Sequence, residues 1–187
     1  MTPGRETPDP VALLPVTLEP ADDRREAVAN LFQFYVHDFA DFWETRRVEL
    51  QEDGRFPPYP WLDAFWEDPQ GEALLIRAGG ALVGFVLIDR TAHSGQACDY
   101  SMAEFFVARH YRREGIGRTA ALDVLGARPG LWEIAVARRN APALTFWRGV
   151  AATAAPSGFG EADQADDRWN GPILRLEVPA RRPASGG

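Results

Sequence analysis

The sequence contains no lysine. All 20 basic residues are arginine, the chain also has 27 acidic residues, and the formal net charge is therefore −7. A chain this acidic lacks the spread positive charge on which general nucleic-acid binding depends. The arginines between positions 109 and 118 are therefore a local exception. We expect no nucleic-acid partner, and we expect any positively charged site to be confined to that segment.

Cysteine is nearly absent, since Cys98 is the only one among the 187 residues. The chain therefore has no internal disulfide and cannot build a thiolate metal site. The three histidines are far apart in sequence and no cluster of other ligands accompanies them, so we expect no metal. Cys98 is interpreted as an idle thiol rather than a nucleophile.

Long apolar runs are also missing. No run reaches the eighteen or so residues needed to cross a bilayer, and the first ten residues, MTPGRETPDP, lack the apolar centre of a signal peptide. We expect a cytoplasmic protein with no membrane partner. Residues 1–10 and 180–187 are rich in proline, charged and small residues and are expected to be disordered tails, which leaves residues 11–179 as one domain.

The apolar pattern alternates between strand and helix periods along this domain. Apolar residues three and four apart predict an amphipathic helix with an aromatic face over residues 22–43, and a Gly-Gly pair between two apolar runs predicts a hairpin. The remaining expected strands are residues 11–20, 102–107, 131–136 and 171–178; the remaining expected helices are residues 61–69, 116–128 and 141–150. This order predicts an α/β fold with a mixed sheet.

The segment RHYRREGIGRTAA, residues 109–121, places two glycines and several arginines at the start of a predicted helix. The first N–H groups of a helix have no partner, and the helix dipole adds partial positive charge there. Glycines let the backbone approach a ligand closely. An anion, above all a phosphate, is the ligand that such a loop favours. The alternative is a tight turn with solvated arginines.

Residues 115–120, GIGRTA, also fit the G-x-G-x-x-A fingerprint of dinucleotide-binding proteins, and Glu133 lies near the position of its ribose-binding acid. The context disagrees with this interpretation. Seven residues separate the predicted strand from Gly115, whereas in the fingerprint the strand runs almost directly into the first glycine. A nicotinamide dinucleotide site therefore remains a remote alternative.

Two segments resemble the GNAT superfamily of N-acetyltransferases. Arg112-x-x-Gly115-x-Gly117 resembles the family's R/Q-x-x-G-x-G/A motif, and EFFVARHYRR resembles the strand that leads into it. LWEIAVARRNAPALTFW resembles the next strand and the helix that follows. Both segments occur in the family's order and spacing within residues 73–150. The resemblance implies a mostly antiparallel mixed sheet with one splayed strand pair and flanking helices.

The resemblance also implies acetyl-CoA as co-substrate. In the family, loop amides hold the pyrophosphate, the preceding strand pairs with the pantetheine, and one strand N–H, here that of Val107, binds the acetyl carbonyl. The residues that this assigns to the cofactor are Phe105, Phe106, Val107, Arg112, Arg113, Gly115, Ile116, Gly117, Arg118, Asn140, Phe146 and Trp147.

Acetyl transfer to an amine needs a base that removes the ammonium proton. Glu104 and Glu133 each lie within an apolar strand, where burial raises a carboxylate's pKa and makes it a better base. Alternation along the strand places Glu104 on the same face as Met102 and Phe106. The alternative for each glutamate is a pair with an arginine or an exposed position at the end of a strand.

Trp147 departs from the family pattern, because many members have a tyrosine there that protonates the leaving thiolate. An indole N–H donates a hydrogen bond but does not release its proton near neutral pH. Either water or another group protonates the thiolate, with Tyr100 and Tyr111 as candidate groups, or the thiolate leaves without receiving a proton. Trp147 is also interpreted as a packing residue beside the cofactor.

The segment FYVHDFADFWE places acids beside an aromatic stripe on the first predicted helix. Acids near aromatic rings suit a cationic amine, so Tyr35, Asp38 and Asp41 are candidate substrate-binding residues. The alternative is an ordinary solvated helix face with packed aromatics behind it.

The leading hypothesis is an acetyl-CoA-dependent N-acetyltransferase that transfers acetyl directly to a primary amine of a small molecule or peptide. Its rival is a CoA-binding regulatory module with little or no turnover, which the missing tyrosine allows. Residues 171–178 are predicted to be an edge strand, through which two copies could pair as a homodimer.

Overall fold

The computed structural model of the chain describes residues 14–40, 42 and 49–180. Both predicted tails, apart from Ala180, lie outside this range, as does Asp41. Within the described residues, no helix has the length and apolar character needed to cross a membrane.

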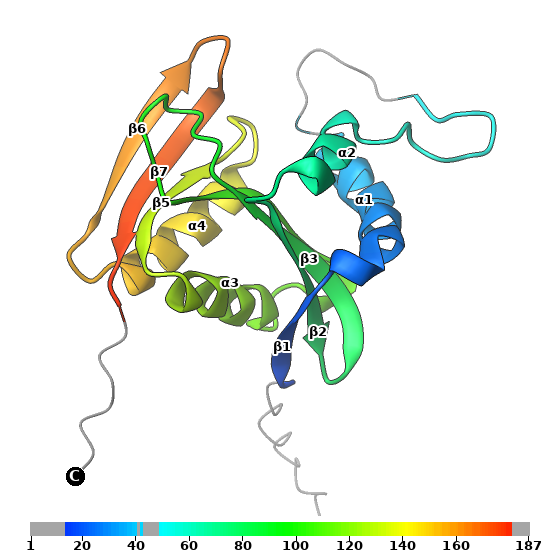
Figure 1. Cartoon of the computed structure of the whole chain (residues 1–187), viewed down its shortest axis with the longest axis horizontal. Helices are drawn as coiled ribbons and strands as arrows, with labels where there is room; N and C mark the ends of the chain where they lie inside the picture. The colour runs from blue at the N-terminus through cyan, green and yellow to red at the C-terminus, as the bar shows by residue number, and fades with distance from the viewer. Residues whose placement is uncertain (1–13, 41, 43–48, 181–187) are drawn as a thin grey trace, which may run out of the picture.

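Seven strands form one sheet in the order β1-β2-β3-β4-β5-β7-β6 (Figure 1). Neighbouring strands are antiparallel except β4 and β5. The strands are β1 (Val16–Pro20), β2 (Glu72–Ala78), β3 (Ala81–Asp89), β4 (Tyr100–Val107), β5 (Gly130–Ala135), β6 (Phe159–Ala165) and β7 (Asn170–Val178). The mixed α/β fold with a mostly antiparallel sheet is confirmed.

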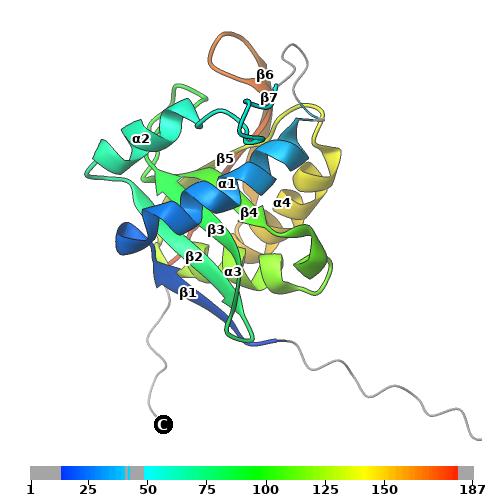
Figure 2. The ribbon, with the colours of Figure 1, turned by 90° about the vertical axis from the view of Figure 1, so that its right-hand side faces the viewer.

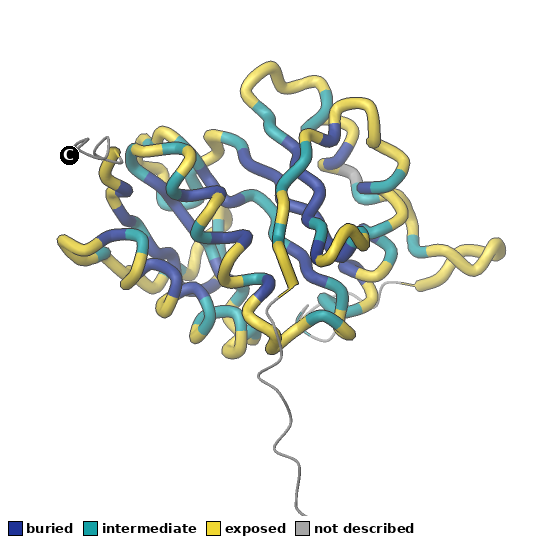
Figure 3. Tube along the Cα trace, turned by 90° about the horizontal axis from the view of Figure 1, so that it is seen from below, coloured by how far each residue is buried: buried dark blue, intermediate teal, exposed yellow. Residues whose placement is uncertain are grey.

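Helices cover both faces of the sheet (Figures 1 and 2). Helices α1 (Arg25–Phe39) and α2 (Pro60–Glu67) lie on one face, and α3 (Ile116–Ala127) and α4 (Ala141–Ala154) lie on the other. Short 3-10 turns precede α1 and follow β4. The three-layer arrangement gives two apolar cores, one on each side of the strands, and the buried residues follow the central strands and the inner sides of the helices (Figure 3).

Strands β4 and β5 are paired at one end only. Their parallel register runs from Tyr100 opposite Trp132 to Ser101 opposite Glu133, and no further. Beyond that point β4 continues beside β3, and β5 continues beside β7. The sheet therefore splits at its centre. This single parallel pair is also too little for the doubly wound parallel sheet of a dinucleotide-binding fold, which removes the nicotinamide alternative.

One residue of β4 interrupts its alternation. Leu87 faces Glu104, but the next residue of β3, Ile88, faces Met102, so Ala103 is an extra residue in β4. The prediction that Met102 shares a face with Glu104 is wrong for this reason: Met102 packs in the core under α3 and α4, whereas Phe106 packs in the core under α1. A bulge of this kind re-aims side chains within a strand.

Strand β6 was not predicted, because its residues FGEADQA carry little apolar character. Strand β6 pairs with β7 along the whole of residues 159–165, so β7 lies inside the sheet between β5 and β6. The expectation that residues 171–178 form a free edge for pairing two copies is therefore wrong. The other predicted strands and helices are present with shifted ends, and α1 ends at Phe39.

Candidate active site

The glycine loop at the start of α3 leaves its backbone donors open. Gly115 caps the helix in the left-handed region with φ of 80°, and Arg113 has φ of 68°. The first loop amide that finds an acceptor at the helix start is that of Thr119, which donates to the carbonyl of Gly115 at 2.9 Å. Within the part of the chain that the structure describes, the N–H groups of residues 113–118 donate to no acceptor. These amides form a site for an anionic group.

The arginine side chains around this loop turn away from the open amides. Arg118 donates from Nη2 to Thr153 Oγ1 at 2.8 Å on α4, and from Nη1 to the carbonyl of Gly149 at 3.2 Å. Arg112 donates from Nε to the carbonyl of Val107 at 2.6 Å. Arg113 is exposed and has no hydrogen-bond or ion-pair partner among the described residues. The loop is thus not filled by its own side chains, and the anion site rests mainly on backbone N–H groups.

The open end of the split in the sheet lies beside this loop. The N–H of Ala108 donates to the carbonyl of Val83 at 2.8 Å, so by the alternation of an antiparallel pair the N–H of Val107 points away from β3. It therefore points into the gap where β4 has no partner on the β5 side. A donor aimed there can stabilise negative charge that develops on a carbonyl oxygen.

Aromatic side chains of β4 and α4 form a wall beside Gly117. Phe105 stacks on Phe146 with ring centroids 5.8 Å apart and meets Trp147 edge-on at 5.2 Å. A Cβ at Gly117 would lie 3.6 Å from Val107 Cγ2 and 3.7 Å from Phe146 Cε2, which is ordinary contact distance. Gly117 therefore keeps a narrow space open between the loop and this wall.

Asn140 begins α4 as its N-cap. Its side-chain oxygen accepts a hydrogen bond from the N–H of Ala143 at 3.1 Å. This contact fixes the start of the helix that carries Phe146 and Trp147. Asn140 is thus engaged locally in a structural role, and a contact of Asn140 with the cofactor stays a prediction.

Glu104 is the centre of a polar cluster on the other face of β4. Tyr35 of α1 donates to Glu104 Oε2, and Tyr59, just before α2, donates to Oε1 at 2.8 Å. Rings surround these groups: Phe32 lies 5.2 Å from Tyr35 and 4.9 Å from Tyr59 between centroids. One carboxylate thus lies half-buried among aromatic side chains, close to the point where the sheet splits.

This environment moves the pKa of Glu104 in two opposing directions. Burial raises the pKa, the hydrogen bonds from Tyr35 and Tyr59 lower it, and the net result is a pKa of about 7. Burial and the neighbouring negative charge of Glu104 raise the pKa of both tyrosines above the usual phenol range. Glu104 is therefore poised as a base near neutral pH, whereas the tyrosines remain proton donors in hydrogen bonds.

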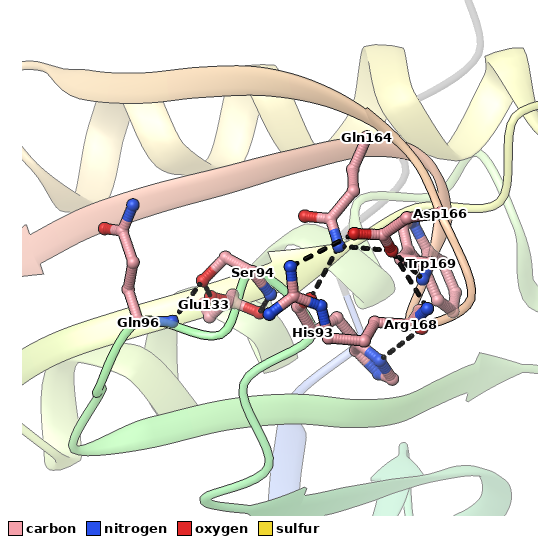
Figure 4. A network of polar contacts seen from close by, with 8 residues as sticks. All are labelled: His93, Ser94, Gln96, Glu133, Gln164, Asp166, Arg168 and Trp169. Atoms are coloured by element: carbon pink, nitrogen blue, oxygen red, sulfur yellow. Dashed lines mark hydrogen bonds and ion pairs between the residues drawn. The ribbon is translucent and has the colours of Figure 1, made fainter.

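Glu133 has a different environment from Glu104. It is fully buried and pairs with Arg175 Nη1 at 2.6 Å. The N–H of Ser94 donates to Oε1 at 3.0 Å, and its hydroxyl donates to Oε2 at 2.5 Å. Figure 4 shows Ser94 beside Glu133, the contact that fastens the loop between β3 and β4 to β5. Every strong interaction of Glu133 is internal, which favours the arginine-paired alternative over a role as base.

Asp38 is held by two arginines. Arg109 Nη2 lies 2.7 Å from Oδ1 and Arg112 Nη2 lies 2.5 Å from Oδ2. Burial on its own raises the pKa of Asp38, but the hydrogen bonds from both arginines outweigh it and hold the pKa below its usual value. Asp38 thereby ties the end of α1 to the segment that follows β4. Its charge is already compensated, so it does not present a free acid to a cationic substrate.

The structure brings together Glu104 and Tyr35, two of the residues predicted to act in catalysis and in substrate binding; those roles stay predictions. It adds Tyr59, which the sequence analysis missed because that residue lies in the proline-rich segment FPPYP. Asp41 lies outside the described residues. Within residues 14–40, 42 and 49–180, no three His, Cys, Asp or Glu side chains are grouped to hold a metal ion.

The family model described as "Acetyltransferase (GNAT) family" matches residues 28–150 of the chain. Among solved structures, an acetyltransferase from Thermus thermophilus is similar at 17% identity and a TM-score of 0.62, covering 89% of this chain and 98% of that one. The PaiA N-acetyltransferase from Thermoplasma acidophilum, solved with coenzyme A, is similar at 12% identity and a TM-score of 0.57, covering 88% and 100%. No curated protein sequence matches the chain.

Proposed function

Because the chain belongs to the GNAT acetyltransferase family, we propose that it is an acetyl-CoA-dependent N-acetyltransferase that transfers acetyl directly to a primary amine. The observation that carries the proposal is the arrangement around β4. Open loop amides and the N–H of Val107 lie at one end of the split, and Glu104, with its pKa of about 7, lies on the face under α1.

The residues fit the co-substrate assigned to them. The unpaired N–H groups of residues 113–118 suit a pyrophosphate, and the aromatic wall of Phe105, Phe146 and Trp147 suits the thioester end of the molecule. Bound acetyl-CoA supplies an activated acyl group. Beyond Ser101, β4 has no strand partner on the β5 side, and this is the edge that an extended pantetheine chain needs for pairing; the carbonyl of Val107 on it accepts from Arg112 Nε.

Glu104 acts as the general base in this proposal. Its carboxylate takes the proton from the acceptor ammonium, directly or through a water, and the free amine then forms the new N–C bond as the C–S bond breaks. The N–H of Val107 donates to the carbonyl oxygen while charge develops there. The nitrogen of the new amide then loses its surplus proton to water or to the departing thiolate. Trp147 cannot release a proton, so none reaches the thiolate from that position.

Direct transfer is preferred to an acyl-cysteine route because of the state of Cys98. Burial, with the neighbouring negative charge of Glu133, raises the pKa of this thiol, which lowers the fraction of nucleophilic thiolate. Cys98 also lies in the loop before β4, outside the segments that form the split.

The second candidate is a CoA-binding module without turnover, and tryptophan at position 147 is the feature that favours it. A thermal-shift and thiol-release experiment separates the two. Both predict that acetyl-CoA raises the melting temperature. Only the enzyme releases free thiol from acetyl-CoA when a panel of primary amines is added, and binding without any amine-dependent thiol release would overturn the enzymatic proposal.

A further inference from the structure

A cavity of about 550 Å³ lies between the end of α1 and the segment that leads into the glycine loop. Its lining is unusual for a chain with a net charge of −7. The residues around it are Asp38, Phe42, Arg109, Arg112 and Arg113. Three arginines and one aspartate therefore line the same space.

The internal contacts of these groups leave positive charge unused. Both oxygens of Asp38 are taken, one by Arg109 and one by Arg112. Arg113 has no hydrogen-bond or ion-pair partner among the described residues. Each of the three arginines retains N–H groups that no described residue accepts, because a guanidinium carries five. The cavity thus presents net positive charge and spare donors, which is the chemistry that binds a carboxylate.

The cavity lies within a short distance of the proposed base. On α1, Tyr35 contacts Glu104 and Asp38 contacts the arginines, and positions three apart on a helix lie about 5–6 Å from each other. On β4, Phe106 is two residues beyond Glu104, which is about 7 Å along a strand. Arg112 lies over the ring of Phe106, with its Cζ 5.5 Å from the centroid. Along both α1 and β4, the separation between Glu104 and the arginines is therefore no greater than the length of a small molecule.

We propose that the acceptor is a small free amino acid, whose amine meets Glu104 and whose carboxylate is bound by the arginines of this cavity. This inference rests on the proposed function and narrows it. An α-amino acid plus one hydrogen bond at each end spans about 8–9 Å, since each such bond joins atoms about 2.8 Å apart. A polyamine would bring its extra positive charge against the arginines, and an internal peptide unit would offer no carboxylate there.

The phosphates of acetyl-CoA are the other anions within reach of these arginines. They are already provided for by the open amides of residues 113–118. Arg109 distinguishes the two ligands, because it lies before the glycine motif and its described contact is with Asp38 of α1. A change at Arg109 that affects the acceptor but not acetyl-CoA assigns the cavity to the acceptor.

The test is amine-dependent thiol release by the full chain with matched pairs of acceptors: L-alanine, L-methionine and L-phenylalanine, each against its carboxamide, with spermidine added. The carboxamide has the less basic amine, so a preference for the acid cannot arise from amine protonation. We expect kcat/KM at least tenfold higher for at least one acid than for its amide. In Arg109→Gln, we expect the preference for the acid to fall about tenfold and the KM for acetyl-CoA to stay unchanged. The control is Arg148→Gln, which changes an exposed arginine paired with Glu161 and should alter neither value.

Equal use of acids and amides, a preference for spermidine, or a raised KM for acetyl-CoA in Arg109→Gln with the acid preference intact would each overturn the inference. If no amine releases thiol, the proposed function fails by itself, and calorimetry then decides the inference. N-acetyl-L-alanine, N-acetyl-L-methionine and N-acetyl-L-phenylalanine, each with its amide, are titrated into the wild-type protein with CoA. Selective binding of at least one acid supports the cavity assignment. Equal binding of acid and amide, or no binding of either, overturns it.

Discussion

The hydroxyl of Tyr35 on α1 donates a hydrogen bond to Glu104 on β4, across the interface between the helix layer and the sheet. The contact joins a residue of the first helix to the carboxylate proposed as the base. Tyr59 reaches the other oxygen of the same carboxylate from the segment before α2. The chemistry assigned to β4 therefore depends on how both helices are packed against it.

Glu104→Gln removes the carboxylate proposed as the base. We expect kcat/KM at neutral pH to fall by about 10²–10³, and the rise of kcat/KM with pH around the wild-type pKa of about 7 to become flat, because the amide cannot take a proton. The measurement is a pH–rate profile from thiol release. Glu177→Gln, on an exposed position of β7, is the control. An unaltered pH profile in Glu104→Gln would remove the residue from this role.

The same carboxylate couples folding stability to pH. Its pKa is about 7 in the folded protein against 4.5 ordinarily, so the charged form is disfavoured by folding. The stabilising contribution of Glu104 is complete below about pH 4.5, is lost progressively as pH rises from 4.5 through the folded pKa of about 7, and changes little above that. Relative to wild type, Glu104→Gln should therefore gain about 3 kcal/mol in free energy of unfolding between pH 4.5 and pH 8. Urea denaturation at several pH values measures this; a constant difference contradicts it.

Tyr35→Phe and Tyr59→Phe each remove a hydrogen bond that lowers the pKa of Glu104. We expect each change to move the acid limb of the kcat/KM profile to higher pH by about one pH unit, since a hydrogen bond to a charged group contributes about 1.5 kcal/mol or more. Tyr100→Phe provides the comparison, because Tyr100 stacks on Trp132 away from this cluster. A loss of kcat without movement of the limb would indicate a purely structural role.

Gly115→Val should abolish acetyl-CoA binding. Gly115 has φ of 80°, which a β-branched residue adopts only with strain, so the loop amides lose their alignment. The readout is the rise in melting temperature with acetyl-CoA, which should be present in wild type and absent in the variant. Gly149→Ala is the matched control: no atom lies within 4 Å of its added Cβ, so protection should persist and α4 should gain up to about 1 kcal/mol. Full protection of Gly115→Val would contradict the loop assignment.

Glu133→Gln should act on stability rather than on the pH dependence of catalysis. The change leaves Arg175 without its buried partner, and breaking such a pair costs about 3–5 kcal/mol. Chemical denaturation gives the loss. A milder loss in the double variant Glu133→Gln, Arg175→Met would show the pairing, since neither charge is then left alone. If the acid limb of kcat/KM moves in Glu133→Gln at a pH where the protein is folded, Glu133 acts in the reaction.

The open glycine loop could be predicted from the sequence, because it depends on local chemistry. Gly115 and Gly117 indicate a loop at the start of a helix whose N–H groups are left unpaired. The pattern can be recognised from residues that are neighbours in sequence. The acceptor side depends on contacts between distant segments. Tyr59 and Glu104 are 45 positions apart in the sequence, and Asp38 and Arg109 are 71 apart. No local sequence pattern predicts either contact.

Two further errors have physical causes. Strict alternation cannot reveal Ala103 as an extra residue, because the bulge depends on the register with β3. Strand β6 has a mostly exposed, polar sequence, and its pairing with β7 rather than any apolar period makes it a strand. The ion pairs of Asp38 with Arg109 and Arg112 are a further feature that only the fold brings about, and a role of Asp38 in binding the substrate stays a prediction.

The bulge at Ala103 determines which face of the sheet Glu104 and its neighbours in β4 occupy. Removing Ala103 would leave Met102 and Glu104 adjacent and still on opposite faces. If β4 instead kept Ala103 and alternated strictly, every side chain between Tyr100 and Met102 would exchange faces with respect to Glu104, or Glu104 would turn toward the layer beneath α3. Either outcome would put the wrong group on one side: a thioether among the tyrosines, or a carboxylate in an apolar layer. A chain with the same residues but no bulge at Ala103 would keep its glycine loop and lose the proposed base.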